Sequence, residues 1–362
     1  AFLRIRYRID GLLRQIRALH KSCWPAMAVR LKVMAGLNIA ETRAPQDGRI
    51  SLQVSGRPVD FRISTQPTLH GENIVLRILD RQRGIVDLDA LGLTDPQLDL
   101  LKLMIARPEG LILVTGPTGS GKTTTLYSIL GHINAEGINI MTLEDPVEYP
   151  MPMIRQTAVA DAARLDFANG VRAMLRQDPD VILVGEIRDA DTARMALQAA
   201  MTGHQVYSTL HTSSAIGAIP RLLDIGILPD ILAGNVIGIV AQRLVRCLCP
   251  ACREARPAHD YEMRLLGLTL PSERPLLHEA RGCPQCDFQG YRGRMAIMEL
   301  LRLDPELDEL VARRATAREL RDAASRKGFR PLADDGARRV LEGATTLDEL
   351  CRVVNLTDRM SP

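Results

Sequence analysis

The chain has 362 residues, of which 46% are hydrophobic and 25% are charged, and its formal net charge is +3. These values are typical of a globular protein with two or three domains. The small net charge excludes a strongly basic surface for polyanions, and 3% aromatic residues supply few platforms for stacking nucleic-acid bases.

The apolar residues are mostly aliphatic and do not form a membrane span. No run of about 18 apolar residues occurs, and the longest candidate, 231–240, is interrupted by glycine and asparagine. No signal peptide is recognisable. We therefore expect a cytoplasmic location, with membrane contact only through partner proteins.

Residues 1–80 are expected to form a small α+β domain. Phe2–Ile9 alternates apolar residues with arginines, which indicates a half-buried strand. Because the chain opens inside a strand, we expect that an N-terminal segment precedes it in the intact protein. A helix is predicted near 25–35, and further strands are predicted at 49–54, 59–63 and 74–79.

Residues 81–93 are predicted to be a linker, and 94–242 a larger α/β core. Thr94-Asp95-Pro96 is a helix-start signal. Aliphatic runs follow, separated by helical stretches, at 111–114, 138–143 and 181–184. Buried parallel strands joined by crossover helices account for this order, so the predicted fold class is α/β with a mainly parallel sheet.

A phosphate-binding loop follows the first of these strands. The glycines of G-x-x-x-x-G-K-T permit a tight loop with inward N–H groups, and the next helix adds its positive end. Lys122 reaches the outer phosphates and the Thr123 hydroxyl ligates Mg²⁺ in such loops. The alternative is a glycine-rich turn with an incidental lysine. The residues predicted to bind ATP are Gly116, Pro117, Thr118, Gly119, Ser120, Gly121, Lys122, Thr123 and Thr124.

Two later strands end in acidic residues. Val181–Val184 leads to Glu186, with Gly185 at the position where such sites usually carry Asp; the other strand leads to Glu144 and Asp145. At the carboxyl edge of a nucleotide-binding sheet, one acid faces Mg²⁺ and another positions the attacking water. Glu144 and Glu186 are the candidates. The alternatives are an exposed strand-end acid for Glu186 and a turn cap for Glu144 and Asp145.

Four basic side chains complete the candidate catalytic set. His204 and His211 bracket another strand, where either residue contacts a terminal phosphate or is a satisfied structural histidine. Arg62 and Arg77 interrupt apolar strands of the first unit. They are either phosphate-contacting arginines, supplied when domains close, or strand-surface arginines with solvated heads.

Residues 243–294 carry two C-x-x-C knuckles, and 295–362 are expected to form short amphipathic helices. Four thiolates are enough to complete the tetrahedral coordination of a zinc ion. Dithiol redox chemistry would need only one C-x-x-C knuckle, whereas this chain has two. In a reducing compartment, paired disulfides are not expected. The predicted structural zinc ligands are Cys249, Cys252, Cys283 and Cys286.

Together these motifs resemble the secretion ATPases of the type II secretion and type IV pilus-assembly family. The likeness covers nearly the whole chain, and the paired cysteines match its zinc-binding members rather than the pilus-retraction relatives. The motifs that carry it include Tyr7–Gly11, Pro45–Arg49, Arg62–Ser64, Gly116–Thr123, Glu144–Pro146, Leu183–Asp189, Gly203–Thr212, Gln242–Arg246 and Gly343–Thr346.

The resemblance implies a RecA-like core behind a PAS-like domain, assembled as a homo-hexameric ring with an inner-membrane platform protein as partner. It implies ATP hydrolysis coupled to domain rotation. The implied roles are general base for Glu144, Mg²⁺ holder for Glu186, nucleotide contacts for His204 and His211, and phosphate contacts for Arg62 and Arg77.

The predicted function is therefore an ATPase motor for pseudopilus assembly in type II secretion. Pilus extension and DNA-uptake pili remain alternatives within the family. A nucleic-acid translocase predicts a basic channel with stacking aromatics, which the composition opposes. A small-molecule kinase predicts an acceptor pocket, for which the sequence gives no support.

Overall fold

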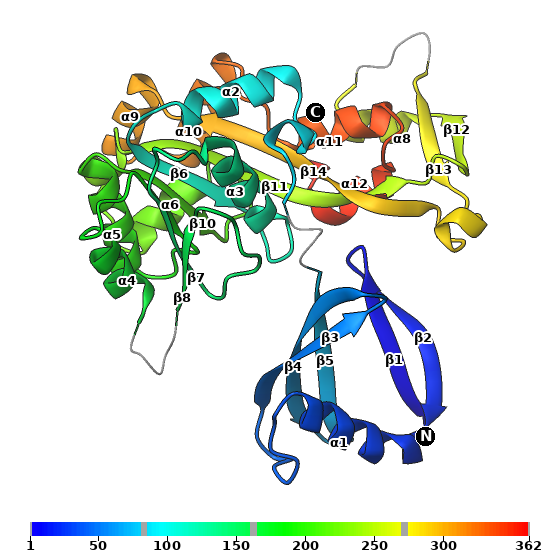
Figure 1. The fold of residues 1–362 in the computed structure, drawn as a ribbon. Coiled ribbons are helices and arrows are strands. Elements are labelled where there is room, and N and C mark those ends of the chain that lie inside the picture. Colours follow the sequence, from blue (N-terminus) through cyan, green and yellow to red (C-terminus); the bar gives the residue numbers. More distant parts are fainter. Residues whose placement is uncertain (1, 81–84, 160–164, 269–273, 361–362) are drawn as a thin grey trace. The chain divides into compact units, whose positions relative to one another are not determined.

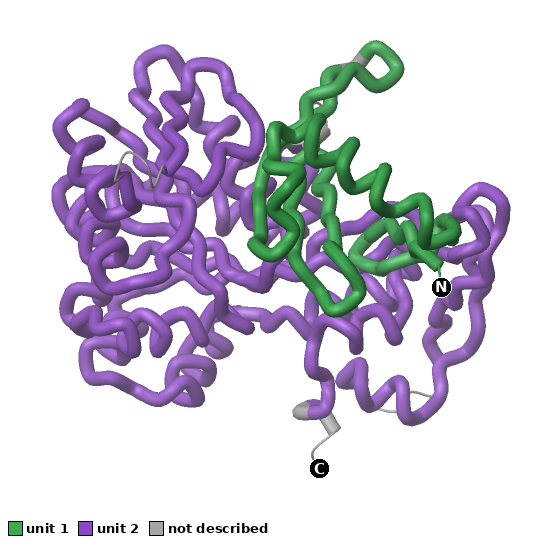
Figure 2. The backbone as a smooth tube through the Cα atoms, turned by 90° about the horizontal axis from the view of Figure 1, so that it is seen from below, with its two compact units in different colours: residues 1–85 green, residues 86–362 purple. Residues whose placement is uncertain are grey.

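The computed structural model describes residues 2–80, 85–159, 165–268 and 274–360. The chain divides into two compact units, residues 1–85 and 86–362 (Figure 2). Residues 81–84 of the predicted linker lie outside the described residues. The remainder of that linker includes Leu88 and Leu91, which are buried in a core cluster of the second unit.

Unit 1 contains a two-stranded hairpin, a helix and a three-stranded antiparallel sheet in the order β3-β4-β5 (Figure 1). Lys32 of the helix is fully buried and pairs with Glu72 at 2.5 Å, which ties the helix to the sheet. The elements are β1 (Phe2–Ile9), β2 (Leu12–His20), α1 (Trp24–Met34), β3 (Gln46–Val54), β4 (Arg57–Thr68) and β5 (Gly71–Asp80).

Strand β2 was not predicted from the sequence. Asp10 and Gly11 both have positive φ, at 48° and 86°, and connect β1 to β2 as a two-residue hairpin turn. Asp-Gly between apolar-alternating segments is a strong local hairpin signal. That dipeptide was therefore the overlooked evidence for β2.

Unit 2 is built on a seven-stranded sheet with the order β14-β11-β6-β10-β9-β7-β8. All neighbouring strands are parallel except β11 and β14. The strands of this sheet are β6 (Gly110–Thr115), β7 (Ile140–Glu144), β8 (Arg155–Ala158), β9 (Val181–Val184), β10 (Gln205–Leu210), β11 (Val236–Leu248) and β14 (Tyr291–Arg302).

Helices cover both faces of this sheet. In β6, Leu111 and Leu113 point into one core cluster, whereas Ile112 and Val114 point into the other. Helices α2 and α3 contribute to the second cluster, and α4, α5, α6, α7 and α9 to α12 to the first. Their bounds are α2 (Asp95–Ile105), α3 (Lys122–Ile133), α4 (Phe167–Met174), α5 (Ala190–Met201), α6 (Ala218–Asp224) and α7 (Pro229–Leu232).

The paired cysteines lie at the far ends of β11 and β14, which continue beyond the rest of the sheet (Figure 1). The expected boundaries at residues 243 and 294 therefore fall inside these two strands. The intervening chain adds a hairpin and one helix, β12 (Arg253–Pro257), α8 (Asp260–Leu265) and β13 (Leu276–Ala280).

The described part of the C-terminal region, up to residue 360, contains four α-helices. They are α9 (Pro305–Ala312), α10 (Ala317–Arg326), α11 (Leu332–Leu341) and α12 (Leu347–Val353). None of the described helices is both long and apolar enough to cross a membrane.

A buried acid fastens α12 to β11. Arg246 donates to Glu349 Oε2 at 2.8 Å and Arg352 donates to Oε1 at 2.7 Å, while the Arg246 guanidinium stacks 3.8 Å from the Tyr291 ring centroid. Burial alone raises the pKa of Glu349, but the two arginines outweigh it and lower the pKa from 4.5 to about 2. The ionised carboxylate therefore stabilises the folded state.

Glu349→Gln is expected to lower the free energy of unfolding at pH 7 by about 3 kcal/mol, the equivalent of this pKa shift. Because the folded pKa lies below the unfolded one, this contribution is complete above pH 4.5 and is lost as the pH falls towards 2. Urea unfolding of parent and variant at pH 7 and pH 3 measures the difference. A difference that stays constant with pH would contradict the assignment.

Candidate active site

The phosphate loop lies where β6 ends and α3 begins. Gly116, Gly119 and Gly121 have φ of 150°, 79° and 93°, and a Cβ at Gly116 would lie 2.5 Å from Ser120 Oγ. Ser120 Oγ is buried and has no hydrogen-bond partner among the described residues. A phosphate oxygen would supply an acceptor for this hydroxyl, so the loop fits a polyphosphate.

Lys122 is the first residue of α3, and its side chain folds back over the loop. Its ammonium donates to the Gly116 carbonyl at 2.8 Å. Burial lowers the pKa of Lys122, and the nearby charge of Glu186 acts in the opposite direction. The ammonium and the acid thus face the same small region at the carboxyl edge of the sheet.

Gln242 of β11 forms hydrogen bonds to the phosphate loop and to α3, and it was not predicted as a site residue. It is 1% exposed, donates to the Ser120 carbonyl at 2.7 Å and accepts from the Thr125 hydroxyl at 2.8 Å. The sequence signals for this role were a polar residue inside an aliphatic strand and its place in the Gln242–Arg246 motif.

Glu186 lies just beyond β9, between two basic side chains. His211 Nε2 is 3.3 Å from Glu186 Oε2, and Arg188 forms an ion pair with Oε1. His211 follows β10, the strand between β6 and β9, so the structure brings Glu186, His211 and the loop to one edge. A carboxylate and a Thr123 hydroxyl are oxygen donors of the kind that Mg²⁺ prefers.

Glu144 ends β7 and is 4% exposed. Its Oε1 accepts from Thr142 at 2.6 Å and from Gln156 at 3.2 Å, and its Oε2 accepts from the Tyr127 hydroxyl. A carboxylate offers about four lone-pair sites. Three are filled here, so the acid is held in one orientation and one lone-pair site remains.

Tyr127 belongs to α3, the helix that starts at the phosphate loop. Burial, reinforced by Glu144, raises the pKa of Tyr127, so the phenol stays protonated and serves as the donor. Glu144 is therefore linked through one side chain to the helix that carries Lys122.

His204 lies at the opposite edge of the sheet, which corrects the expectation that it faces the nucleotide within one chain. It precedes Gln205, which pairs with Gly110 at the start of β6, and its Nδ1 lies 3.0 Å from the Ala199 carbonyl oxygen. Six strand residues separate it from the loop edge, a span of about 20 Å. The strand that the two histidines bracket holds them at opposite ends, so only His211 reaches the loop edge.

Arg62 and Arg77 are directly opposite each other on β4 and β5 of unit 1. Arg49 of β3 pairs with Arg62 on its other side, so three arginines form one row across the sheet. Arg49 was not predicted as a site residue. Its position beside Arg62 becomes visible only once the pairing of β3 with β4 is known. Three arginines therefore lie side by side across the three strands of the sheet.

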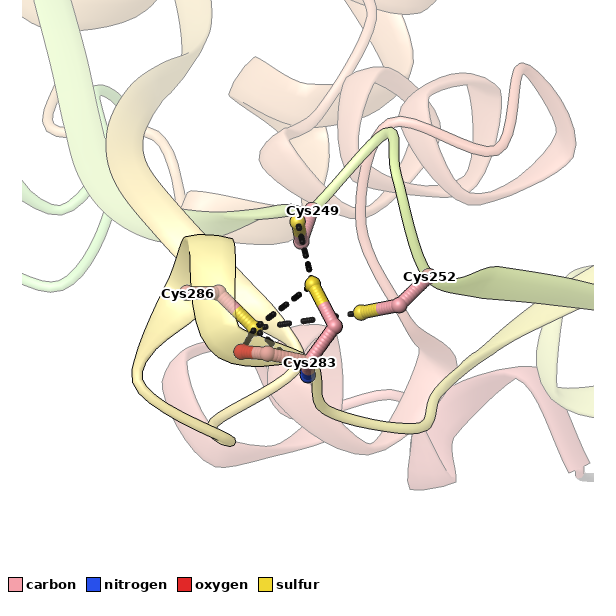
Figure 3. A group of neighbouring side chains, drawn as sticks. All are labelled: Cys249, Cys252, Cys283 and Cys286. Atoms are coloured by element: carbon pink, nitrogen blue, oxygen red, sulfur yellow. Dashed lines mark hydrogen bonds between the residues drawn. The ribbon is translucent and has the colours of Figure 1, made fainter.

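The four predicted cysteine ligands come together (Figure 3). Their Sγ atoms lie within 4.8 Å of one another, with separations of 3.9 Å for Cys249–Cys283 and 3.8 Å for Cys252–Cys286 and Cys283–Cys286. Tetrahedral Zn–S bonds of about 2.3 Å place sulfurs roughly 3.8 Å apart. The cluster therefore fits a closed zinc site.

Comparison with known proteins shows which family the chain belongs to. Residues 1–352 match the family described as type II/IV secretion system protein. The chain belongs to this family. It is 50% identical over 349 residues to the type II secretion system protein E of Pseudomonas aeruginosa, which covers 96% of this chain and 69% of that protein. It is 48% identical over 351 residues to the type II secretion system ATPase E of Vibrio cholerae, covering 97% and 69%.

Solved structures agree with this membership. The pilus retraction motor PilT with bound ADP superposes with a TM-score of 0.62 at 28% identity, over 97% of this chain and 90% of that one. The Legionella pneumophila ATPase DotB superposes with a TM-score of 0.66 over 95% and 86%, and at 22% identity it supports the fold alone. The α/β fold with a mainly parallel sheet is confirmed, and the family member described here is an ATPase.

Proposed function

We propose that this chain is the ATP-hydrolysing motor of a type II secretion machine, and that it works as a homo-hexamer assembling a pseudopilus. The observation that carries the proposal is the convergence of the phosphate loop, Glu186 and Glu144 at one sheet edge, in a chain about half identical to type II secretion ATPases. No candidate function outside this family has comparable support.

ATP occupies the loop from Gly116 to Thr124 in this proposal, with Lys122 against its outer phosphates. Mg²⁺, when bound by Thr123 and Glu186, neutralises phosphate charge. Glu144 accepts a proton from the attacking water, and His211 orients Glu186. Arg62 and Arg77 complete the charge neutralisation when unit 1 closes on the nucleotide, and reopening after hydrolysis moves a partner protein.

The partner is proposed to be an inner-membrane platform protein, with the motor on the cytoplasmic face. A chromosomal Lys122→Ala exchange in the source bacterium is expected to abolish export of extracellular proteins, which accumulate in the periplasm. The measurement is the protein content of the medium and periplasm. Intact secretion together with loss of surface pili would contradict the proposal and favour a pilus-extension ATPase.

Zinc is the proposed occupant of the cysteine cluster. Cys283→Ser is expected to reduce bound zinc from about one per chain to none and to lower the unfolding temperature by about 5 °C or more. Elemental analysis and a thermal melt measure both effects. Cys351→Ser, at an exposed cysteine outside the cluster, is the control and should change neither; retained zinc in Cys283→Ser would refute the site.

A further inference from the structure

Strand β14 carries one buried carboxylate among aliphatic neighbours. Glu299 is 2% exposed and lies between Met298 and Leu300, both of which are buried. Burying a carboxylate is costly unless hydrogen bonds compensate. The compensation here comes from two backbone N–H groups, Ala215 at 2.6 Å to Oε1 and Leu332 at 2.7 Å to Oε2.

These two donors belong to parts of the chain that are far apart in sequence. Leu332 is the first residue of α11. Ala215 belongs to residues 211–217, named here the post-β10 loop. Glu299 therefore connects this loop to the C-terminal helices through a single side chain.

The post-β10 loop begins at the candidate active site. His211 contacts Glu186, and Thr212 exchanges hydrogen bonds with Thr115, the residue just before the phosphate loop, with its N–H 2.9 Å from Thr115 Oγ1. Arg243 of β11 donates to the Ser213 carbonyl at 2.8 Å. The loop is thus held from β6, β11 and β14 at successive residues.

We propose that Glu299 is a positioning residue for ATP hydrolysis, which holds the post-β10 loop so that His211 stays against Glu186. Through Oε2 the same carboxylate also accepts from the Leu332 N–H of α11, and this second contact is not needed for the role. The inference rests on the proposed roles of Glu186 and His211. It differs from them because Glu299 touches neither nucleotide nor metal.

A structural role restricted to α11 is the competing explanation, and the chain provides a matched control for it. Asp335 of α11 is also buried, accepts from the Met298 N–H at 2.9 Å and pairs with Arg338. Asp335 therefore joins the same strand and helix without touching the post-β10 loop.

The test compares Glu299→Gln with Asp335→Asn in the full chain. A glutamine offers one carbonyl oxygen, so one of the two N–H groups loses its acceptor. We expect Glu299→Gln to lower kcat about tenfold or more with KM for ATP changed less than twofold, and to speed amide exchange in residues 211–217 about tenfold. Asp335→Asn is expected to leave both values within twofold of the parent.

The inference would be overturned if Glu299→Gln had the kcat and the loop exchange rate of the parent. It would also be overturned if Asp335→Asn lost as much kcat as Glu299→Gln. If Glu299→Gln fails to fold, Glu299→Asp, which withdraws the carboxylate by one methylene from the Ala215 N–H, takes its place, and unchanged loop exchange there also overturns the inference. Amide exchange reports on the loop without any hydrolysis. Full activity of Lys122→Ala would instead refute the proposed ATP site, which separates the two failures.

Discussion

Glu144→Gln is expected to reduce ATP turnover by about 10²–10³-fold while leaving ATP affinity within a factor of about three. The carboxylate has one lone-pair site left for water after Thr142, Gln156 and Tyr127 have taken the others. An amide in its place has a similar shape but is a much weaker base. Steady-state phosphate release and nucleotide binding, measured separately, distinguish the two quantities.

An exposed acid from the same stretch of chain provides the control for this prediction. Glu136 lies in the turn between α3 and β7, and Glu136→Gln should hydrolyse ATP at the parental rate. Turnover of Glu144→Gln within threefold of the parent would remove Glu144 as the base and leave Glu186 as the remaining candidate. Weakened ATP affinity would indicate instead that the substitution has disturbed α3 through Tyr127.

Lys122→Ala is expected to weaken ATP binding by about 10²-fold and to reduce turnover by about 10³-fold, because a charge-assisted contact to phosphate is lost inside a partly buried site. The ammonium now bonded to the Gly116 carbonyl is the only lysine in the loop. Fluorescent nucleotide titration and phosphate release measure these effects at one salt concentration.

Lys102→Ala is the matched control for the lysine. Lys102 lies on α2, is partly exposed and pairs with Asp89 at 2.7 Å. Its removal should leave binding and turnover unchanged. If Lys122→Ala bound ATP as tightly as Lys102→Ala, the phosphate loop would not be the nucleotide site.

Local sequence signals predicted the candidate residues that depend on one strand and its following turn. The loop from Gly116 to Lys122, the strand-end acids Glu144 and Glu186, and the four cysteines each combine a distinctive residue type with a fixed spacing. Parallel strands bring their carboxyl ends to one edge, so the predicted strand direction already put the acids at the same sheet edge as the loop.

Residues that act across the fold were not predictable in this way. Gln242 and Glu299 are single polar residues within aliphatic strands, and their partners lie more than 30 residues away. Arg49 joins the row of Arg62 only through strand register. The nucleotide contact that the resemblance implied for His204 was wrong, because the strand between the two histidines puts His204 at the other edge of the sheet.

Strand β11 runs from beside Ser120 to the residue before Cys249. Its first half pairs with β6, and residues 238–248 pair with β14, with one register irregularity between Arg246 and Leu248. One strand therefore connects the phosphate loop directly to the cysteine cluster, so a change at either site reaches the other without crossing a loop.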